Sequence, residues 1–225
     1  MNISIRKLNK SYGNEEVFKN FNIDFHDEKV NCIIGRSGCG KSTLLNIIAG
    51  LTEIQSGEIQ GISLNDISYI FQEDRLIKWL TVKENLELAL KKYYDNSAID
   101  EKINELLELM GICDIKNKYP NSLSGGMKQR VNIARAFGKP SKVILMDEPF
   151  KSLDYKLKYT IIDEFKTLLN KEKRMVILVT HDLDEAIYFQ GNITVFSNKP
   201  VQIKGIFNKD LDKRKNEILK IIYTD

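Results

Sequence analysis

The feature that most limits what this chain can fold into is the run GRSGCGKS at residues 35–42, which fits the pattern G-x-x-x-x-G-K-[ST]. The apolar stretch VNCIIG (30–35) precedes it and predicts a buried strand. The stretch after it (41–51) carries leucine and isoleucine at helical spacing. The glycines let the backbone curl with its N–H groups pointing inward, and a helix start favours negative charge. A strand, a glycine loop and a helix in this order predict a phosphate-binding loop in an α/β fold.

The sequence predicts a separate role for each of three side chains in this loop. Lys41 is placed to reach the β- and γ-phosphates of a nucleotide, and the Ser42 hydroxyl is placed to bind Mg²⁺. Cys39 has two interpretations: a cysteine near a helix N-terminus can have a lowered pKa, or a small residue merely fits there. A glycine-rich turn with a chance GKS is the alternative for the whole run.

Two acids end another predicted buried strand, in VILMDEP (143–149). Strand ends of a parallel sheet meet at one edge, so Asp147 and Glu148 are expected near the phosphate loop. Asp147 suits Mg²⁺ through water, and Glu148 is placed to polarise an attacking water. The alternative is two solvated acids at a strand end.

Two further polar residues lie at or just after the end of a predicted strand. His181 follows the predicted strand MVILVT (175–180), and Gln72 ends the predicted strand ISYIFQ (67–72). Each taken alone is more often structural than functional.

The run LSGGMKQR (123–130) adds a second helix start suited to an anion, far along the chain from the first.

The remaining patterns predict how the chain is organised. Residues 3–8 and 17–25 alternate apolar and polar side chains and predict strands, whereas the stretch after residue 76 is rich in Glu, Lys and Leu at helical spacing. We expect one α/β domain over 1–225. Its core and N-terminal β-subdomain cover 1–75 and 131–225, and its helical subdomain covers about 76–130.

Composition indicates which partners and which cellular compartment to expect for the protein. The net charge of +3 is spread along the chain and does not demand nucleic acid, which we do not expect as a partner. Three cysteines without a CxxC pair argue against a disulfide framework and for a reducing compartment. No apolar run approaches the roughly 18 residues that span a bilayer, and no apolar signal-peptide core begins the chain. These features predict a cytoplasmic protein that reaches a membrane only through partners.

Taken together, the motifs resemble those of the ATP-binding cassette (ABC) ATPases, over nearly the whole chain and in the order of that family. GRSGCGKST resembles the Walker A loop, Gln72 the Q-loop, and LSGGMKQR the family signature. VILMDE resembles Walker B, SLD (152–154) the D-loop, and VTHD the loop of the switch histidine. The resemblance implies a P-loop NTPase core with an N-terminal antiparallel β-subdomain and an inserted α-helical subdomain.

The resemblance also implies roles for single residues, with ATP and Mg²⁺ as cofactors. Tyr12 would stack on adenine, Glu148 would be the general base, and His181 would sense the γ-phosphate. Gln72 would bind Mg²⁺ and report the γ-phosphate to the partner; Ser42 and Asp147 would also hold Mg²⁺. The residues that would bind the phosphates and Mg²⁺ are Gly35, Arg36, Ser37, Gly38, Cys39, Gly40, Lys41, Ser42 and Thr43.

A second copy of the chain is the implied reason for two anion-binding helix starts. Ser124, Gly125 and Gly126 would donate to the γ-phosphate held by the loop of another copy, and Asp154 would pair across the interface. A head-to-tail homodimer then has two equivalent sites.

What the ATPase drives is also suggested by resemblance. A single cassette without membrane spans is typical of importers, whose permease subunits are separate chains and receive solute from an extracytoplasmic substrate-binding protein. QEDRLIKWLTVKENL (72–86) is similar to the nitrate, sulfonate and taurine importer subfamily, although Lys78 stands where proline is usual. That subfamily also carries thiamine-precursor pyrimidines, so the substrate stays open. A non-transport ABC ATPase acting on another macromolecule is the alternative function.

Trp79, the only tryptophan, has two interpretations. It is either core of the helical subdomain or part of a groove wall that receives a short helix of the permease.

Overall fold

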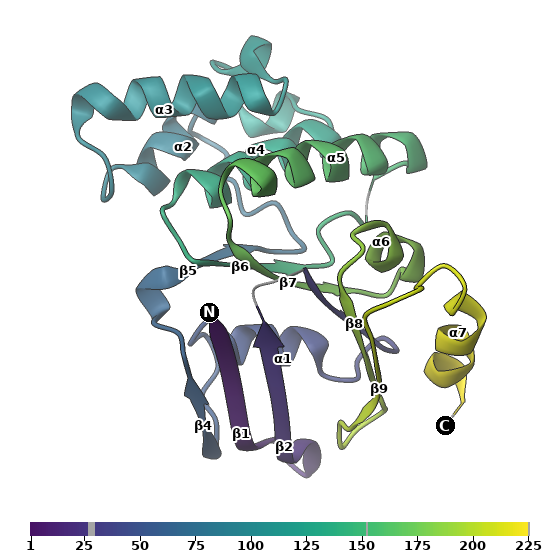
Figure 1. Cartoon of the computed structure of the whole chain (residues 1–225). Helices are drawn as coiled ribbons and strands as arrows, with labels where there is room; N and C mark the ends of the chain where they lie inside the picture. Colours follow the sequence, from purple (N-terminus) through teal and green to yellow (C-terminus); the bar gives the residue numbers. More distant parts are fainter. Residues whose placement is uncertain (27–29, 152, 225) are drawn as a thin grey trace. The chain divides into compact units, whose positions relative to one another are not determined.

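The computed structural model describes residues 1–26, 30–151 and 153–224, and it divides into two compact units. The first unit comprises Met1–Ile67, Val143–Glu148 and Met175–Asp225. The second unit comprises Ser68–Lys142 and Pro149–Arg174. Figure 1 labels the strands and helices of both units and colours them along the sequence from the N-terminus to the C-terminus.

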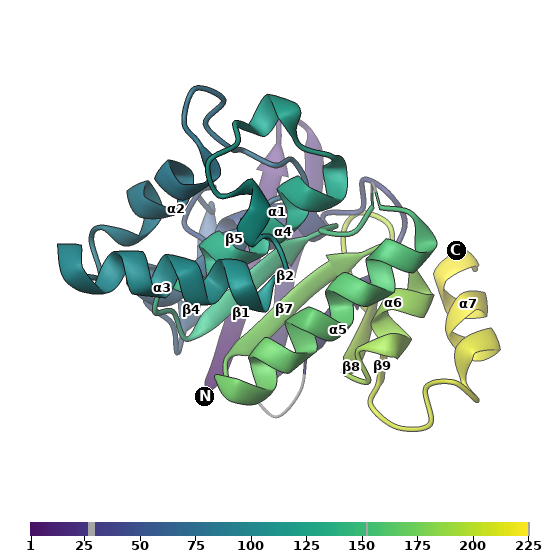
Figure 2. The same cartoon turned by 90° about the horizontal axis from the view of Figure 1, so that it is seen from above.

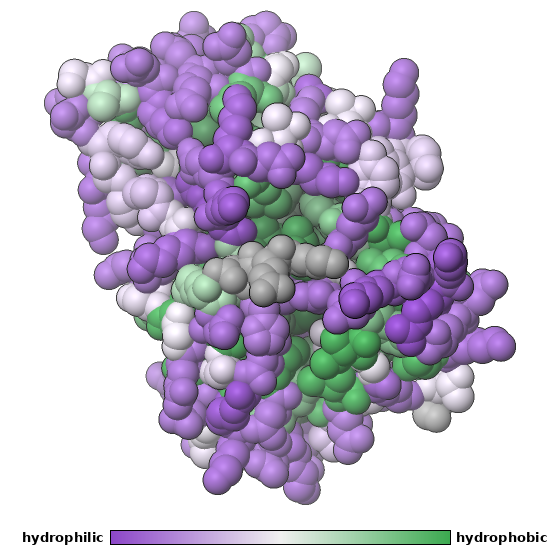
Figure 3. Space-filling model, viewed as in Figure 1, coloured by the Kyte–Doolittle hydropathy of each residue, from purple (hydrophilic) through white to green (hydrophobic). Residues whose placement is uncertain are grey.

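The first unit contains a three-stranded antiparallel sheet of order β2-β1-β4, formed by β1 (Asn2–Tyr12), β2 (Glu15–His26) and β4 (Ser56–Gln60). Apolar side chains alternate with polar ones along β1 and β2, because one face of the sheet is buried and the other meets solvent. In Figure 3, hydrophilic side chains cover the region where Figure 1 places β1 and β4. The fully buried side chains of the two long strands include those of Ile3, Ile5, Leu8, Val17, Phe18 and Phe25.

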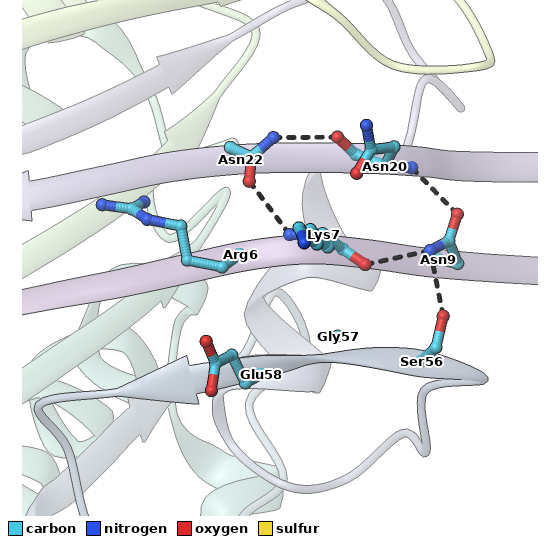
Figure 4. Close-up of a pocket in the computed structure, with 8 residues that line it drawn as sticks. All are labelled: Arg6, Lys7, Asn9, Asn20, Asn22, Ser56, Gly57 and Glu58. Carbon is cyan, nitrogen blue, oxygen red and sulfur yellow. Dashed lines mark hydrogen bonds between the residues drawn. The ribbon is translucent and has the colours of Figure 1, made fainter.

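Asparagine side chains stabilise the irregular middle of this sheet (Figure 4). Lys7 and Asn20 both adopt the left-handed region, each at φ 49°, where the ladder between β1 and β2 shifts register. Asn22 Oδ1 accepts a hydrogen bond from Lys7 N, and Asn9 Oδ1 accepts one from Asn20 N, both at 2.9 Å. Asn9 Nδ2 also donates to Lys7 O and to Ser56 Oγ of β4. Side-chain amides therefore replace the ladder hydrogen bonds that the bulges remove.

The second sheet of the first unit brings the site-bearing strands together in the order β6-β7-β3-β8-β9. The first four strands are parallel, and β9 pairs antiparallel with β8. Every residue of β3, β6 and β7 is buried, which explains why these strands read as continuous apolar runs. The strands are β3 (Asn31–Ile34), β6 (Val143–Asp147), β7 (Met175–Thr180), β8 (Asn192–Phe196) and β9 (Ile203–Phe207).

The described part of the first unit has the α-helices α1 (Lys41–Ile48), α6 (Leu183–Tyr188) and α7 (Lys215–Tyr223), and a 3₁₀ turn at Leu64–Asp66. Helix α1 follows β3 through the glycine loop and contacts β6 and β7. Helix α7 contacts β8, and the Lys215 ammonium forms an ion pair with Asp184 of α6 at 2.5 Å.

The second unit is helical. It contains α2 (Val82–Leu90), α3 (Asn96–Leu109), α4 (Gly125–Gly138) and α5 (Tyr155–Lys171). Helix α4 contacts the other three, and Figure 2 shows these helices from above. The approach is close at Gly138, where an added Cβ would lie 2.6 Å from a methyl of Leu90. Short 3₁₀ turns lie at Cys113–Ile115 and Pro120–Ser122, and strand β5 (Ile67–Ile70) leads into this unit.

Several predicted elements are confirmed, and some boundaries were wrong. Strands β6 and β7 coincide with the predicted 143–147 and 175–180. Helix α5 begins at Tyr155 rather than at residue 160, because Asp154 caps it by accepting from Leu157 N at 3.0 Å. Strand β5 ends at Ile70, two residues before the predicted end. The predicted subdomain boundaries at 76 and 130 stay a prediction, and Ser152 of SLD lies outside the described residues.

Among the described residues, no helix has both the length and the apolar character that crossing a membrane requires.

Candidate nucleotide-binding site

The glycine loop connects β3 to α1 in the way the sequence predicts. Gly38 and Gly40 have φ values of 78° and 121°, a region that side-chain-bearing residues rarely adopt. A Cβ at Gly40 would also lie 2.8 Å from Cγ1 of Val17. The first helical hydrogen bond runs from Leu44 N to Gly40 O at 2.9 Å. The N-terminal N–H groups of α1 therefore remain available to an anion.

Lys41 lies inside the loop. Its side-chain ammonium donates to Gly35 O at 2.8 Å and to Arg36 O at 2.9 Å, and the residue is only 4% exposed. The carbonyls of the loop thus hold the ammonium in place. A positive charge fixed among inward-pointing N–H groups is suited to balancing a polyphosphate.

Cys39 is a buried residue of the loop, and burial raises the pKa of its thiol, only partly offset by the nearby Lys41 ammonium. Its Sγ would lie 3.0 Å from a Cβ added at Gly35. The interpretation of Cys39 as a small residue that fits is therefore favoured, and a lowered pKa is wrong because desolvation outweighs the favourable charge.

Ser42 and Asp147 form the part of the site that fits Mg²⁺. The Ser42 hydroxyl donates to Asp147 Oδ1 at 2.9 Å, and Asp147 is 8% exposed at the end of β6. A hydroxyl and a carboxylate are oxygen ligands of the kind this cation prefers. No group of three or more His, Cys, Asp or Glu side chains that could hold a metal occurs within the described ranges.

Glu148 and His181 meet beyond the ends of the neighbouring strands β6 and β7. His181 Nδ1 lies 3.2 Å from Glu148 Oε2, with side-chain exposures of 50% and 12%. Glu148 has φ 43°, a strained value for a residue with a side chain, and its N–H donates to Val179 O at 2.9 Å. Strained backbone of this kind is common at functional sites. The backbone conformation of Glu148 orients its largely buried carboxylate toward the accessible imidazole of His181.

Tyr12 ends β1 in the same unit and is 50% exposed. The ammonium of Lys10 lies 4.6 Å from the centroid of its ring. An exposed aromatic ring with a cation on it is compatible with the predicted stacking on a base.

The other predicted site residues lie in the second unit, where they cap helices or follow a strand. Ser124 caps α4 by accepting from Met127 N at 3.3 Å, so LSGG is a helix start as predicted. Asp154 caps α5. Gln72 is exposed two residues beyond β5. Arg75, three residues further on, adopts φ 42°, and its guanidinium lies 3.7 Å from the centroid of the Phe71 ring.

Trp79 is 79% exposed, so its interpretation as core is wrong. Its neighbour Leu76 is buried instead. The side chain of Asn85 holds this segment by accepting from Ile77 N at 2.8 Å and donating to Leu80 O at 3.1 Å. The indole is therefore presented to solvent by a fixed turn.

Arg135 was missed by the sequence reasoning although it contacts the segment after Gln72. Its guanidinium donates to Arg75 O at 3.0 Å. The signal was present as polar residues at positions 128, 132 and 135, which share one face of a helix.

A glycine loop between a strand and a helix, with acids ending a neighbouring parallel strand, defines a P-loop nucleotide-binding protein. Residues 18–151 match the ABC transporter family, and the chain belongs to that family. It is the ATP-binding, ATP-hydrolysing component of that family, whose members use Mg²⁺ with ATP.

Curated relatives match the chain over almost its full length. It is 38% identical, over 96% of this chain and 90% of the relative, to the aliphatic sulfonates import ATP-binding protein SsuB of Bacillus thuringiensis subsp. konkukian. It is 39% identical, over 94% and 87%, to the protein of that name from Bacillus cereus.

Solved structures show the same fold. The dimeric structure of MJ0796, described as a bacterial ABC transporter cassette, superposes with a TM-score of 0.81 at 30% identity, covering 92% of this chain and 98% of that one. Clostridium perfringens cbiO1, part of the ABC transporter complex cbiONQ, gives 0.82 at 25% identity, covering 97% and 93%. The predicted P-loop NTPase core of an ABC ATPase is therefore confirmed as the fold.

Proposed function

We propose that the chain is the ATP-hydrolysing subunit of an ABC importer that takes up a small organic anion, with aliphatic sulfonates as the first candidate. The observation that carries the proposal is identity of 38% over 96% of the chain to a sulfonate import ATP-binding protein. The nitrate-, taurine- and thiamine-precursor-type solutes remain alternatives, because the segment carrying Lys78 departs from the subfamily pattern.

Each site residue then has a chemical task. The loop from Gly35 to Thr43 binds the phosphates of ATP, with the Lys41 ammonium balancing their charge, and Tyr12 stacks on the base. Glu148 accepts a proton from the attacking water, and His181, 3.2 Å from it, contacts the γ-phosphate. Ser42 and Asp147, with Gln72, hold Mg²⁺, which neutralises charge on the β- and γ-phosphates when bound.

A second copy of the chain completes each site in this proposal. Ser124, Gly125 and Gly126 begin α4, and their N–H groups face no intrahelical acceptor. They donate to the γ-phosphate held by the other copy, while Asp154 pairs across the interface. Support comes from the dimeric structures of the MJ0796 cassette, one of them bound to ADP and Pi. Hydrolysis then requires closure of the two copies.

A mixture of two inactive variants tests the shared site. A dimer of one Ser124→Arg subunit and one Lys41→Ala subunit has one intact composite site and one doubly damaged site. Activity in the mixture should exceed that of either parent. If ATP-bound heterodimers form and the activity stays at the parental level, the shared site is ruled out.

The partners follow from the importer assignment. We expect separate permease subunits in the membrane, served by an extracytoplasmic substrate-binding protein, and a location on the cytoplasmic face through the permease. The exposed Trp79, on the turn fixed by Asn85, is the proposed contact with the permease, and residues 76–130 are the proposed helical subdomain. A non-transport ABC ATPase is the alternative, with no observation of its own in favour.

The importer assignment is tested by reconstitution. The chain is co-expressed with a candidate permease, purified from solubilised membranes and placed in vesicles with the matching binding protein. ATPase activity should rise severalfold with an aliphatic sulfonate and not with an unrelated sugar. Failure to co-purify with any permease would contradict the importer but not the ATPase.

A further inference from the structure

Helix α4 holds the turn that follows Gln72 through one guanidinium. Arg135 donates to the carbonyl oxygens of Arg75 at 3.0 Å and of Asp74 at 3.4 Å. Its second terminal nitrogen also donates to Asn132 Oδ1 at 3.0 Å. The fork of the guanidinium thus joins two successive carbonyls of the turn to its own helix.

A second contact on the same face of α4 reinforces the first. The Lys128 ammonium lies 3.3 Å from Asp74 Oδ2. Positions 128, 132 and 135 follow one another at helical spacing, so they form one stripe along the helix. We call Lys128, Asn132 and Arg135 the α4 stripe. All three of its members belong to the contacts that hold residues 74 and 75.

The segment that the stripe holds also has contacts with aromatic rings just before it. Arg75 adopts φ 42°, and its guanidinium lies 3.7 Å from the centroid of the Phe71 ring. Phe71 stacks on Tyr69 with ring centroids 4.0 Å apart. Gln72 is exposed and lies between Phe71 of the stacked pair and the two residues whose carbonyls Arg135 holds.

The same helix carries the signature residues at its first turn. Ser124 caps α4, and Gly125 is its first residue. Ten residues separate Gly125 from Arg135, about 15 Å along a helix at ~1.5 Å per residue. Helix α4 contacts α2, α3 and α5, so it moves as a packed element rather than bending freely.

We infer that Arg135 is a positioning residue that couples the Q-loop to the signature motif, so that displacement of Gln72 moves Ser124 and Gly125 with it. The inference rests on the proposed function for the roles of Gln72 and Ser124. It adds the physical link between them, which runs from Gln72 through Asp74 and Arg75 to Arg135 and along α4.

Arg174 provides the matched control within the same unit. Its guanidinium donates to the carbonyls of Lys139 at 2.8 Å and Phe137 at 2.9 Å, so it also joins backbone segments. It contacts neither Asp74 nor Arg75 in any described interaction. A purely structural role for Arg135 predicts that the two arginines behave alike.

The experiment compares Arg135→Ala, Arg135→Lys and Arg174→Lys with the wild type in the full chain. Measurements are kcat and KM for ATP, the midpoint of thermal unfolding, and the change in Trp79 emission on adding ATP with Mg²⁺. Trp79 is the only tryptophan and lies four residues after Arg75, so its emission reports this segment.

For Arg135→Ala we expect kcat to fall at least tenfold with KM within twofold of wild type, because the phosphate loop lies in the other unit. The ATP-dependent change in Trp79 emission should be lost. Arg135→Lys should recover part of kcat. Arg174→Lys should lower the unfolding midpoint and keep both kcat and the emission change.

If Arg135→Ala should fail to fold, Lys128→Ala removes only the contact with Asp74 and should lower kcat by a smaller factor. Wild-type kcat in either folded variant overturns the inference. So does an equal loss of kcat in Arg174→Lys at the same unfolding midpoint. Failure of the proposed function would be distinct, because the wild type itself would then not hydrolyse ATP.

Discussion

His181 Nδ1 lies 3.2 Å from Glu148 Oε2, although the two residues follow different strands and are separated by more than thirty positions. The contact arises because β6 and β7 are parallel neighbours, with Asp147 opposite Val179. The N–H of Glu148 then donates to Val179 O, and the left-handed backbone at Glu148 aims its carboxylate at the imidazole. The parallel pairing of β6 and β7 thus places the Glu148 carboxylate next to the His181 imidazole.

Glu148→Gln should separate binding from hydrolysis. The amide keeps the size of the side chain but cannot accept a proton from water, so we expect kcat to fall by about 10²–10⁴-fold. ATP binding, measured by equilibrium dialysis, should stay within a few fold of wild type. Near-normal hydrolysis in this variant would remove Glu148 from the role of general base.

Lys41→Ala should instead weaken ATP binding itself. The ammonium, held by Gly35 O and Arg36 O, is the charge that the loop offers to a polyphosphate. We expect affinity for ATP to fall at least tenfold, as measured by titration with a fluorescent nucleotide. Lys19→Ala removes an exposed lysine of β2 and is the control for net charge. Equal affinities in the two variants would contradict the assigned role.

The parts of the site that the sequence predicted are those in which one strand end or one helix start fixes the residue. Asp147 and Glu148 end a continuous apolar strand, and Ser124 precedes two glycines, so local pattern was enough to place them. Trp79 and Arg135 depend on tertiary contacts. The Asn85 side chain turns the indole outward, and the carbonyls that Arg135 holds belong to a turn sixty residues earlier. No local periodicity encodes such pairings.

Gly125 and Gly126 should respond differently to alanine. A Cβ at Gly125 meets no atom within 4 Å, whereas one at Gly126 would lie 2.2 Å from Leu157 Cδ2. Gly125→Ala should therefore keep or slightly raise stability, since alanine favours helix. Gly126→Ala should lower the unfolding free energy by about 1–3 kcal/mol. Both should lower ATPase activity if these N–H groups serve the partner's nucleotide.

The double variant Gly126→Ala with Leu157→Ala identifies the cause. Removing the leucine methyls should erase the cost of the new Cβ, so the effect of Gly126→Ala on stability should be near zero in that background. Urea unfolding of the four proteins in the cycle measures this. An unchanged cost in the Leu157→Ala background would point to backbone strain rather than overlap.

Glu164 should make stability fall as pH rises. Burial raises its pKa above the ordinary value of 4.5, although the Arg130 guanidinium, 2.9 Å away, opposes the shift. Between 4.5 and the raised pKa, the unfolded chain ionises while the folded chain keeps its proton, so unfolding releases a proton there. Glu164→Gln removes this contribution, and urea unfolding across pH 2–8 should show the variant gaining on wild type as pH rises above 4.5.

Asp95→Asn is the control of opposite sign, because hydrogen bonds from Ala98 N and the Ser97 hydroxyl lower the pKa of Asp95 below 3.8. Its deficit should shrink only as pH falls below that value. A difference between Glu164→Gln and wild type that does not change above pH 4.5 would contradict the raised pKa.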